Sequence, residues 1–118
     1  MLAIAEATGI EKMALVSIQD AVSGSGLPQS LLMKARYPDR FFVFAGLNHA
    51  ARLSGGKVKA ASLAEQAEAF AAMGCDGIKM IEGKPTSRQQ MNVPVTDPYF
   101  ADCWARVEAL GLPILWHV

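Results

Sequence analysis

The sequence has no excess of charge of either sign and few cysteines. Lysine plus arginine and aspartate plus glutamate each number 11, so the formal net charge is +0. Without a block of like charge, the sequence does not indicate binding to nucleic acid or to an anionic membrane. The 2 cysteines, Cys75 and Cys103, are not in a metal-ligand spacing, so we expect free, buried thiols. The expected partner is a small-molecule substrate or another protein.

Targeting signals, membrane spans and common catalytic motifs are also missing. No basic N-terminal segment precedes an apolar stretch, and no apolar run reaches the ~20 residues that span a bilayer. We therefore expect a soluble, cytoplasmic protein. No dinucleotide fingerprint, P-loop, nucleophile elbow or zinc-protease motif is present. Hydrophobic residues make up 52% of the 118 residues, which is enough for a packed core in a single domain spanning residues 1–118.

Short apolar segments along the chain predict buried strands. They are Met13–Ile18, Phe41–Leu47, Gly77–Ile81 and Pro113–His117. Each is largely apolar at successive positions, which is typical of parallel strands covered on both faces. Gly74 and Gly111 each follow a helical pattern and precede a strand, where glycine closes a helix in the left-handed conformation.

The segments between these strands carry helix signals. Ser62 and Glu65 form a capping box, in which each side chain accepts a hydrogen bond from the other's backbone N–H. The Asp97–Pro98 pair predicts an N-cap and a first helical position, and Pro28 opens a further helix. Leu2–Thr8 has the pattern of the last turns of another helix. The alternation of helix and strand predicts right-handed βαβ units in one parallel sheet.

The loops that follow the strands are long, whereas the turns that precede them are short. The long loops are Gln19–Leu27, Asn48–Ala61 and Glu82–Thr96. Long surface loops cost little stability and often carry functional residues. In parallel α/β proteins the carboxyl ends of the strands hold the functional site. We therefore expect the site at this edge.

The size of the chain fits part of a larger barrel. A complete (β/α)8 barrel needs about 250 residues, and no covering helix follows the final strand. We expect an α/β fold in which parallel βα units form about half of a (β/α)8 TIM-type barrel. Such a half-barrel leaves two edge strands unpaired, which predicts self-association into a homo-oligomer. The alternative is a small open-sheet module that binds a ligand or a protein without catalysis.

Family-like motifs occur at three of the predicted strands. They are Tyr37–Ala45 (YPDRFFVFA), Gly74–Met80 (GCDGIKM) and Gly111–Val118 (GLPILWHV). Together they resemble the third, fourth and fifth barrel strands of the amidohydrolase-related family, in the branch that holds the aminocarboxymuconate-semialdehyde and resorcylate decarboxylases. The resemblance implies that the chain covers strands two to five. It also implies hydrolysis of a C–N or C–O bond, or non-oxidative decarboxylation of a small carboxylated substrate.

The resemblance also implies a divalent metal, usually zinc. That family holds its metal with a His-x-His pair on strand one, a histidine on strand five and an aspartate on strand eight. His117 matches the strand-five histidine, and the other ligands have no match in this chain. His117 is thus the implied metal ligand, and the isolated chain is expected to be inactive. From the residue alone, a histidine satisfied by a hydrogen bond at a buried edge is the alternative.

Lys79 and His49 are the candidate catalytic residues. Lys79 lies inside an apolar strand, where an ammonium group needs a partner. We interpret it as lining the site and holding a substrate carboxylate or a neighbouring acid, with a structural ion pair as the alternative. His49 follows a strand and is a candidate for assisting proton transfer, with a solvated histidine as the alternative.

Candidate substrate-binding residues follow two of the strands. Asn48 ends the strand at Phe41–Leu47, and it is also the residue type that forms a turn. Glu82 and Lys84 follow Gly77–Ile81, and Arg88 lies further along the same loop. These charges predict an anion-binding role, against the alternative that they only solvate the loop.

Overall fold

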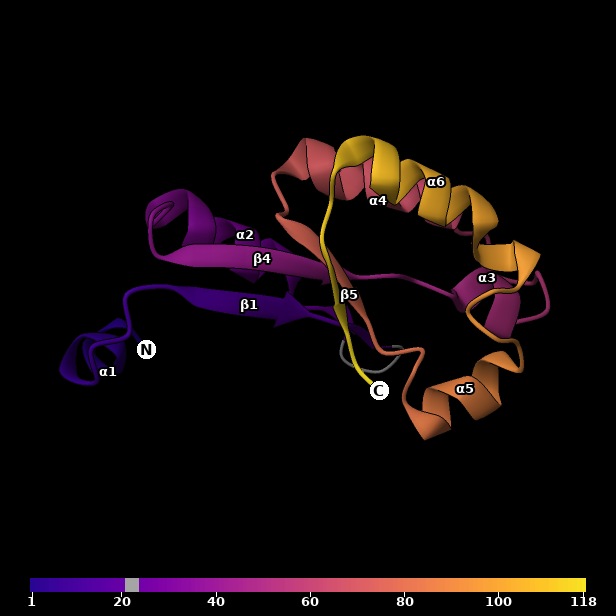
Figure 1. Cartoon of the computed structure of the whole chain (residues 1–118), viewed down its shortest axis with the longest axis horizontal. Coiled ribbons are helices and arrows are strands. Elements are labelled where there is room, and N and C mark those ends of the chain that lie inside the picture. The colour runs from indigo at the N-terminus through magenta and orange to yellow at the C-terminus, as the bar shows by residue number, and fades with distance from the viewer. Residues whose placement is uncertain (21–23) are drawn as a thin grey trace.

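The computed structural model describes residues 1–20 and 24–118 and has an α/β fold (Figure 1). A 4-stranded sheet has the order β1-β4-β5-β6, formed by Met13–Ser17, Phe41–Gly46, Gly77–Met80 and Ile114–Trp116. All three strand pairs are parallel. The predicted parallel strands are therefore confirmed, and each ends one residue before its predicted end.

The main helices lie where the sequence signals predicted, with starts and ends that differ by one to three residues in α1, α2 and α6. They are α1 (Leu2–Ala7), α2 (Leu27–Arg36), α4 (Leu63–Met73) and α6 (Ala101–Leu110), the last preceded by the 3-10 helix η1 (Pro98–Phe100). The capping box of α4 is confirmed: Ser62 Oγ accepts from the backbone N–H of Glu65 at 3.2 Å, and Glu65 Oε2 accepts from that of Ser62 at 2.7 Å. Gly74 and Gly111 end α4 and α6 with φ of 92° and 63°. Local backbone chemistry thus decides these boundaries.

Short elements that we did not predict lie inside the long loops. They are β2 (Gln19–Asp20), which pairs antiparallel with β3 (Gly24–Ser25), α3 (Ala50–Leu53) and α5 (Pro85–Met91). Residues 21–23 of the expected loop Gln19–Leu27 lie outside the described residues. Elements this short show too little periodicity for a sequence pattern to reveal. Within the described ranges, no helix has both the length and the apolar character needed to cross a membrane.

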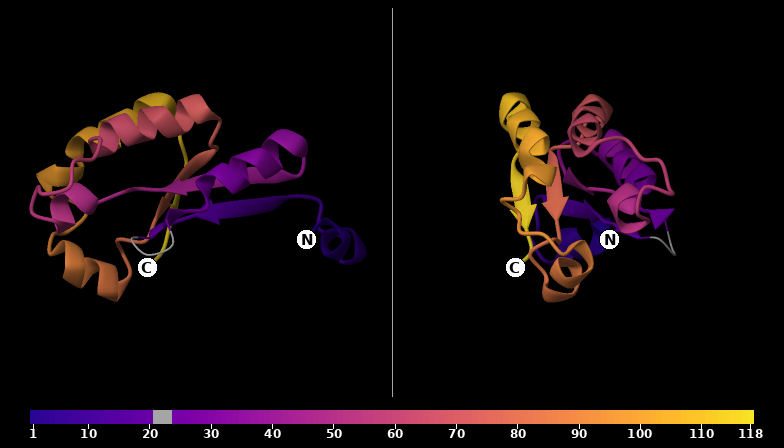
Figure 2. Two further views of the ribbon diagram at one scale, coloured as in Figure 1. Left: turned by 180° about the vertical axis from the view of Figure 1, so that it is seen from behind. Right: turned by 90° about the vertical axis from the view of Figure 1, so that its right-hand side faces the viewer.

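The helices α2, α4 and α6 cover one face of the sheet (Figures 1 and 2). Our expectation of strands covered on both faces is confirmed for β5, whose four residues are all buried, and was wrong for β1, β4 and β6. Along β4, Val43 and Ala45 are fully buried, whereas Phe42 between them is 42% exposed. Val16 of β1 and Leu115 of β6 are also exposed. The sheet therefore has one face packed under helices and one open apolar face.

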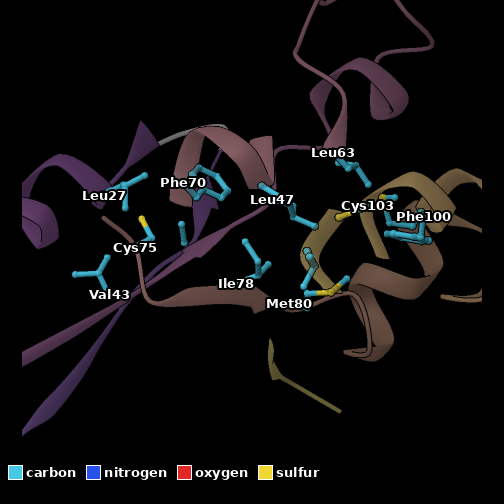
Figure 3. Close-up of a cluster of buried hydrophobic side chains, with 14 residues drawn as sticks. Leu27, Val43, Leu47, Leu63, Phe70, Cys75, Ile78, Met80, Phe100 and Cys103 are labelled. Carbon is cyan, nitrogen blue, oxygen red and sulfur yellow. The ribbon is translucent and has the colours of Figure 1, made fainter. Parts of the chain in front are cut away.

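The hydrophobic core lies between the sheet and the covering helices (Figure 3). It is made of aliphatic and aromatic side chains with both cysteines, including Leu27, Val43, Leu47, Phe70, Cys75, Ile78, Met80, Phe100 and Cys103. Both thiols are free and buried, as expected. Each fully buried Val, Ile or Met side chain contributes about 1.5–3 kcal/mol relative to an exposed one. This packing fixes β4 and β5 and therefore the residues at their carboxyl ends.

Candidate functional site

A buried polar cluster lies at the carboxyl ends of β4 and β5. His49 follows β4 and Glu82 follows β5, and Nε2 of His49 is hydrogen-bonded to Oε1 of Glu82. On its other side, Nδ1 of His49 lies 2.9 Å from the hydroxyl oxygen of Tyr99. The side chains of His49 and Glu82 are only 9% and 4% exposed. We name His49, Glu82 and Tyr99 the His49 cluster.

Asn48 and Gln66 hold the loop that carries His49. Oδ1 of Asn48 accepts from the backbone N–H of Ala50 at 2.8 Å, which forms an Asx turn at the start of α3. The side chain of Gln66, buried in α4, accepts from the backbone N–H of Asn48 at 2.7 Å and donates to its carbonyl at 2.9 Å. Asn48 therefore forms a turn, which was the alternative to its substrate-binding role. This turn orients His49.

Glu82 is positioned by a tight turn packed against the end of β6. The backbone N–H of Lys84 donates to the carbonyl of Ile81 at 2.9 Å and closes the turn. A Cβ at Gly83 would overlap the carbonyl oxygen of His117 and the indole nitrogen of Trp116, so only glycine fits there. The close approach of this turn to β6 leaves Glu82 pointing into the buried cluster.

Tyr99 comes from a third part of the chain, in η1. Asp97 caps η1 by accepting from the backbone N–H of Tyr99 at 2.9 Å, as the Asp97–Pro98 pair predicted. The guanidinium carbon of Arg52 lies 4.7 Å from the centre of the Tyr99 ring. The ring also meets that of Phe100 edge to face, with centroids 4.9 Å apart. These contacts fix the hydroxyl beside His49.

The protonation of the cluster follows from the burial of Tyr99. Burial raises the pKa of its hydroxyl, the charges of Glu82 and Cys103 add to this, and Arg52 opposes it. At neutral pH the phenol keeps its proton, and its oxygen is hydrogen-bonded to Nδ1 of His49. On the other side of the ring, Nε2 of His49 is hydrogen-bonded to Oε1 of Glu82. Oε1 of Glu82 is held in this way, while the buried Oε2 has no hydrogen-bond partner in the described part of the chain.

A pocket of about 480 Å³ opens beside the His49 cluster. Its lining includes His49, Glu82 and Asn48, together with Gln19 from β2 and Met91 from α5. This volume lies within the range of about 300–1,000 Å³ of small-molecule sites. The structure therefore brings three of the sequence-predicted residues to one wall, at the edge of the sheet where we expected the site.

Lys79 lies in β5 and belongs to the face of the sheet opposite the hydrophobic core. Ile78 and Met80 on either side of it point into the core, and Lys79 pairs with Leu115 in β6. Although Lys79 is buried, no carboxylate lies within 4.0 Å of its ammonium group among the side chains that the structure describes, which do not include that of Asp20. The structural ion pair that we weighed is therefore not found there. A role of Lys79 in catalysis stays a prediction.

Lys84 and Arg88 are exposed and do not line the pocket. Lys84 is the N-cap of α5, and Arg88 lies in the same helix. Lys84 and Arg88 therefore lie apart from the pocket that His49 and Glu82 line, although all four residues follow the carboxyl ends of neighbouring strands in the sequence. Their anion-binding role stays a prediction.

His117 is exposed after the end of β6, where its backbone N–H donates to the carbonyl of Met80 at 2.9 Å. Strand alternation continued from Leu115 places His117 on the open face, the face of Lys79. Within the described residues, no group of three or more His, Cys, Asp or Glu side chains is arranged to hold a metal ion. The residues present do not fit a metal centre by themselves, and no chemical step below uses one.

Sequence reasoning missed Tyr99, Gln66 and Arg52. Tyr99 follows the Asp97–Pro98 cap signal, but nothing local indicates that its hydroxyl meets His49, 50 residues earlier in the chain. Gln66 follows the capping box of α4 and looks like an ordinary helix residue. The contacts of these residues exist only after α4, α6 and the loops have packed.

Comparison with known protein families and with curated proteins gave no match.

Proposed function

We propose that the chain is part of a cytoplasmic amidohydrolase-type enzyme, covering strands two to five of its barrel, in which the His49 cluster performs general acid–base chemistry. The reaction would be hydrolysis of a C–N or C–O bond, or non-oxidative decarboxylation of a small carboxylated substrate. One observation carries the proposal: the His49–Glu82 pair is buried on the wall of a pocket at the carboxyl ends of parallel strands. This is where parallel α/β enzymes carry their sites.

Each member of the cluster has a role in the proposed hydrolysis. Glu82 accepts a proton from the attacking water, whose oxygen bonds to the substrate carbon. Glu82 then gives this proton to the leaving nitrogen or oxygen as its bond to carbon breaks. His49 is a positioning residue, because its Nε2–H holds Oε1 and so directs Oε2. Tyr99 helps to fix the orientation of the His49 ring through its hydrogen bond with Nδ1.

A zinc ligand at His117 remains part of the proposal for the parent enzyme. A catalytic zinc needs about three protein ligands, so His117 would have to be joined by side chains from outside residues 1–118. Elemental analysis of the chain and of a longer barrel containing it would test this. The longer protein should lose zinc on His117→Ala, and an unchanged zinc content would contradict the assignment.

The acid–base proposal is tested by activity assays on matched variants. We would measure hydrolysis of small amides and esters, and decarboxylation of 2,6-dihydroxybenzoate, for a longer barrel that contains this chain, unmodified and with Glu82→Gln or His49→Asn. Removing a general acid or base lowers rates by about 100- to 10,000-fold, so Glu82→Gln should lose nearly all activity. Glu108→Gln is the matched control, because it makes the same change at an exposed position of α6 that does not line the pocket.

The outcomes separate the competing functions. Turnover that survives Glu82→Gln at the unmodified rate would contradict the proposed mechanism. Saturable binding of a substrate at the pocket without turnover would instead favour the alternative of an open-sheet binding module.

We also propose that the chain forms a homo-oligomer through its open face. Both β1 and β6 are edge strands in the described sheet, and Val16, Phe42 and Leu115 are exposed beside them. A two-fold axis parallel to the strands would place β6 of one copy beside β1 of the next and bury this face. Sedimentation should show a dimer that Phe42→Ser weakens. A monomer at all concentrations would contradict it.

A further inference from the structure

A series of contacting aromatic rings leads from the His49 cluster to the end of β6. The rings of Tyr99 and Phe100 meet edge to face with centroids 4.9 Å apart, and Phe100 stacks on Trp104 at 5.6 Å. Trp104 and Trp116 follow at 6.2 Å. Tyrosine and tryptophan are the aromatic side chains that lose an electron most easily. These four rings, which we name the aromatic chain, therefore link three oxidisable side chains.

The two ends of the aromatic chain differ in their contact with solvent. Trp104 and Trp116 are half-buried, whereas Phe100 is fully buried in the core. The indole N–H of Trp104 donates to the carbonyl of Val95 at 3.0 Å, which holds that ring in place. The tryptophan end therefore reaches the surface, while the other end meets the buried His49.

The hydroxyl of Tyr99 lies beside a base at that buried end. A phenol that loses an electron becomes a strong acid, so its oxidation is favoured where a base accepts the proton. Nδ1 of His49 is 2.9 Å from the phenol oxygen, within the range of about 2.6–3.2 Å for proton transfer. Nε2 of the same ring is hydrogen-bonded to Glu82, whose charge would stabilise the imidazolium that forms.

Arg52 adds a condition on how Tyr99 can be oxidised. Its guanidinium carbon lies 4.7 Å from the centre of the Tyr99 ring. A positive charge at this distance opposes a second positive charge on the ring. Loss of the electron must therefore be accompanied by loss of the proton, which leaves a neutral tyrosyl radical.

We propose that Tyr99 is a redox-active tyrosine, and that the aromatic chain conducts oxidising equivalents to it from Trp116. The co-reactant is a diffusible one-electron oxidant, of the class of radicals formed from peroxide or carbonate, that meets Trp116 at the surface. This activity is separate from the acid–base reaction proposed for the His49 cluster, and it needs no substrate in the pocket.

One electron moves along the aromatic chain in this step. Trp116 gives an electron to the oxidant, which is thereby reduced. Trp104 replaces the electron of Trp116, and Tyr99 replaces that of Trp104. Phe100 is harder to oxidise and serves as the contact between the Tyr99 and Trp104 rings. The oxidation therefore ends on Tyr99.

One proton moves at the same time. An ionised carboxylate only accepts hydrogen bonds, so Nε2–H of His49 donates to Glu82, and Nδ1 of the neutral ring is free to accept. The O–H bond of Tyr99 breaks, and its proton forms an N–H bond at Nδ1. A one-electron reductant such as a thiol then restores the phenol, which recovers its proton from His49.

The composition of the chain allows the radical to be assigned to a residue. The chain has 2 tyrosines and 2 tryptophans. The other tyrosine, Tyr37, ends α2 and packs against Phe41, with centroids 6.4 Å apart. Tyr37→Phe is the matched control for Tyr99→Phe, because it makes the same change away from the aromatic chain and leaves Tyr99 as the only tyrosine.

Flash oxidation of the chain by photoexcited tris(bipyridyl)ruthenium with a sacrificial electron acceptor tests the proposal. Transient absorption distinguishes tryptophanyl from tyrosyl radicals, and EPR of frozen samples identifies them. In the unmodified chain and in Tyr37→Phe, the tryptophanyl signal should decay as a tyrosyl signal rises. Tyr99→Phe should lose the tyrosyl signal and keep the tryptophanyl one. A radical that stays on tryptophan in the unmodified chain, or a tyrosyl signal that Tyr37→Phe removes, would overturn the proposal.

Trp104→Phe tests the path of the electron. It keeps an aromatic ring but removes the oxidisable side chain between Trp116 and Tyr99. Conversion of the tryptophanyl signal into the tyrosyl signal should become slower, and an unchanged rate would contradict conduction through Trp104. Circular dichroism melting curves establish that the variants are folded, and the Tyr37→Phe measurement decides the radical site if Tyr99→Phe does not fold.

The proton acceptor is identified without changing His49. In Tyr37→Phe with isotope-labelled histidine, pulsed EPR should show a labelled nitrogen coupled to the tyrosyl radical and a bridging hydrogen that exchanges in heavy water. The other of the 2 histidines, His117, is exposed after β6 and lies outside the aromatic chain. A tyrosyl radical with neither coupling would overturn proton transfer to His49.

Discussion

Replacement of Gly77 by alanine tests whether β6 packs against β5 as closely as the structure shows. A Cβ at this position would lie 2.5 Å from Cε1 of Phe44 and 2.5 Å from the carbonyl oxygen of Pro113. The phenyl ring of Phe44 can turn away. The carbonyl of Pro113 cannot, because it accepts a hydrogen bond from the backbone N–H of Ile78 at 2.9 Å. β6 must therefore move by about 1 Å to restore an ordinary contact distance.

The expected loss of stability follows from these contacts. Overpacking of this kind costs about 1–3 kcal/mol, and weakening the Ile78–Pro113 hydrogen bond adds about 1 kcal/mol. A total of about 2–4 kcal/mol is a large part of the ~5–15 kcal/mol that stabilises a typical domain. Gly26→Ala is the matched control, because nothing lies within 4 Å of the added Cβ and the φ of Gly26 is −76°. We expect it to cost less than about 1 kcal/mol.

Urea unfolding followed by tryptophan fluorescence measures this effect. The rings of Trp104 in α6 and Trp116 in β6 have centroids 6.2 Å apart, so fluorescence reports directly on the attachment of β6. With a slope of about 2 kcal/mol per molar urea, within the usual range of about 1–3, the midpoint of Gly77→Ala should fall by about 1–2 M. Equal midpoints for Gly77→Ala and Gly26→Ala would refute the packing of β6 described above.

Four further predictions follow from local features of the structure. Asp76→Ala removes the acceptor of the Val43 backbone N–H, bonded at 2.7 Å, and should lower the free energy of unfolding by about 1–3 kcal/mol in denaturant titrations; no change would contradict the contact. Ser62→Ala should cost about 0.5–2 kcal/mol in thermal melts by removing the cap of α4. Hydrogen bonds with Ser62, first with its backbone and then with its side chain, lower the pKa of Glu65 below 4.5. Ionised Glu65 therefore stabilises the folded chain above pH 4.5, and this contribution is lost as the pH falls through the lower pKa of the folded state. Glu65→Gln should therefore destabilise the chain at neutral pH and much less in acid, and an equal effect at both would count against the capping box. Burial raises the pKa of Cys103 to about 11, so a thiol reagent near pH 8 should label it only after unfolding, and rapid labelling of the folded chain would contradict this.

Local signals in the sequence were sufficient for the main elements of the fold. The strands at Phe41–Gly46 and Gly77–Met80 are continuous apolar segments, and α4 begins at a capping box and ends at Gly74. These features depend on residues a few positions apart, and their physical causes act before any tertiary contact forms. The parallel order followed from the alternation of helices with strands. The half-barrel itself stays a proposal.

The candidate site was predictable only in part. The sequence placed His49 and Glu82 at the carboxyl edge of neighbouring strands, but it gave them separate roles. It also grouped Lys84 and Arg88 with Glu82, although Lys84, the N-cap of α5, and Arg88, within α5, are exposed and do not line the pocket. Whether a loop residue points inward depends on turns such as the one at Gly83, and a strand-edge pattern does not contain that information.

The amino-acid sequence alone determined where helices and strands form, because capping groups, glycines and apolar runs act over a few residues. Only the tertiary structure decided that His49 meets Glu82, 33 residues away, and Tyr99, 50 residues away, and that one face of the sheet stays open. The physical reason is that a hydrogen bond between distant residues depends on the packing of every element between them. In this chain, the burial of Ile78 and Met80 beneath α4 and α6 provides that packing.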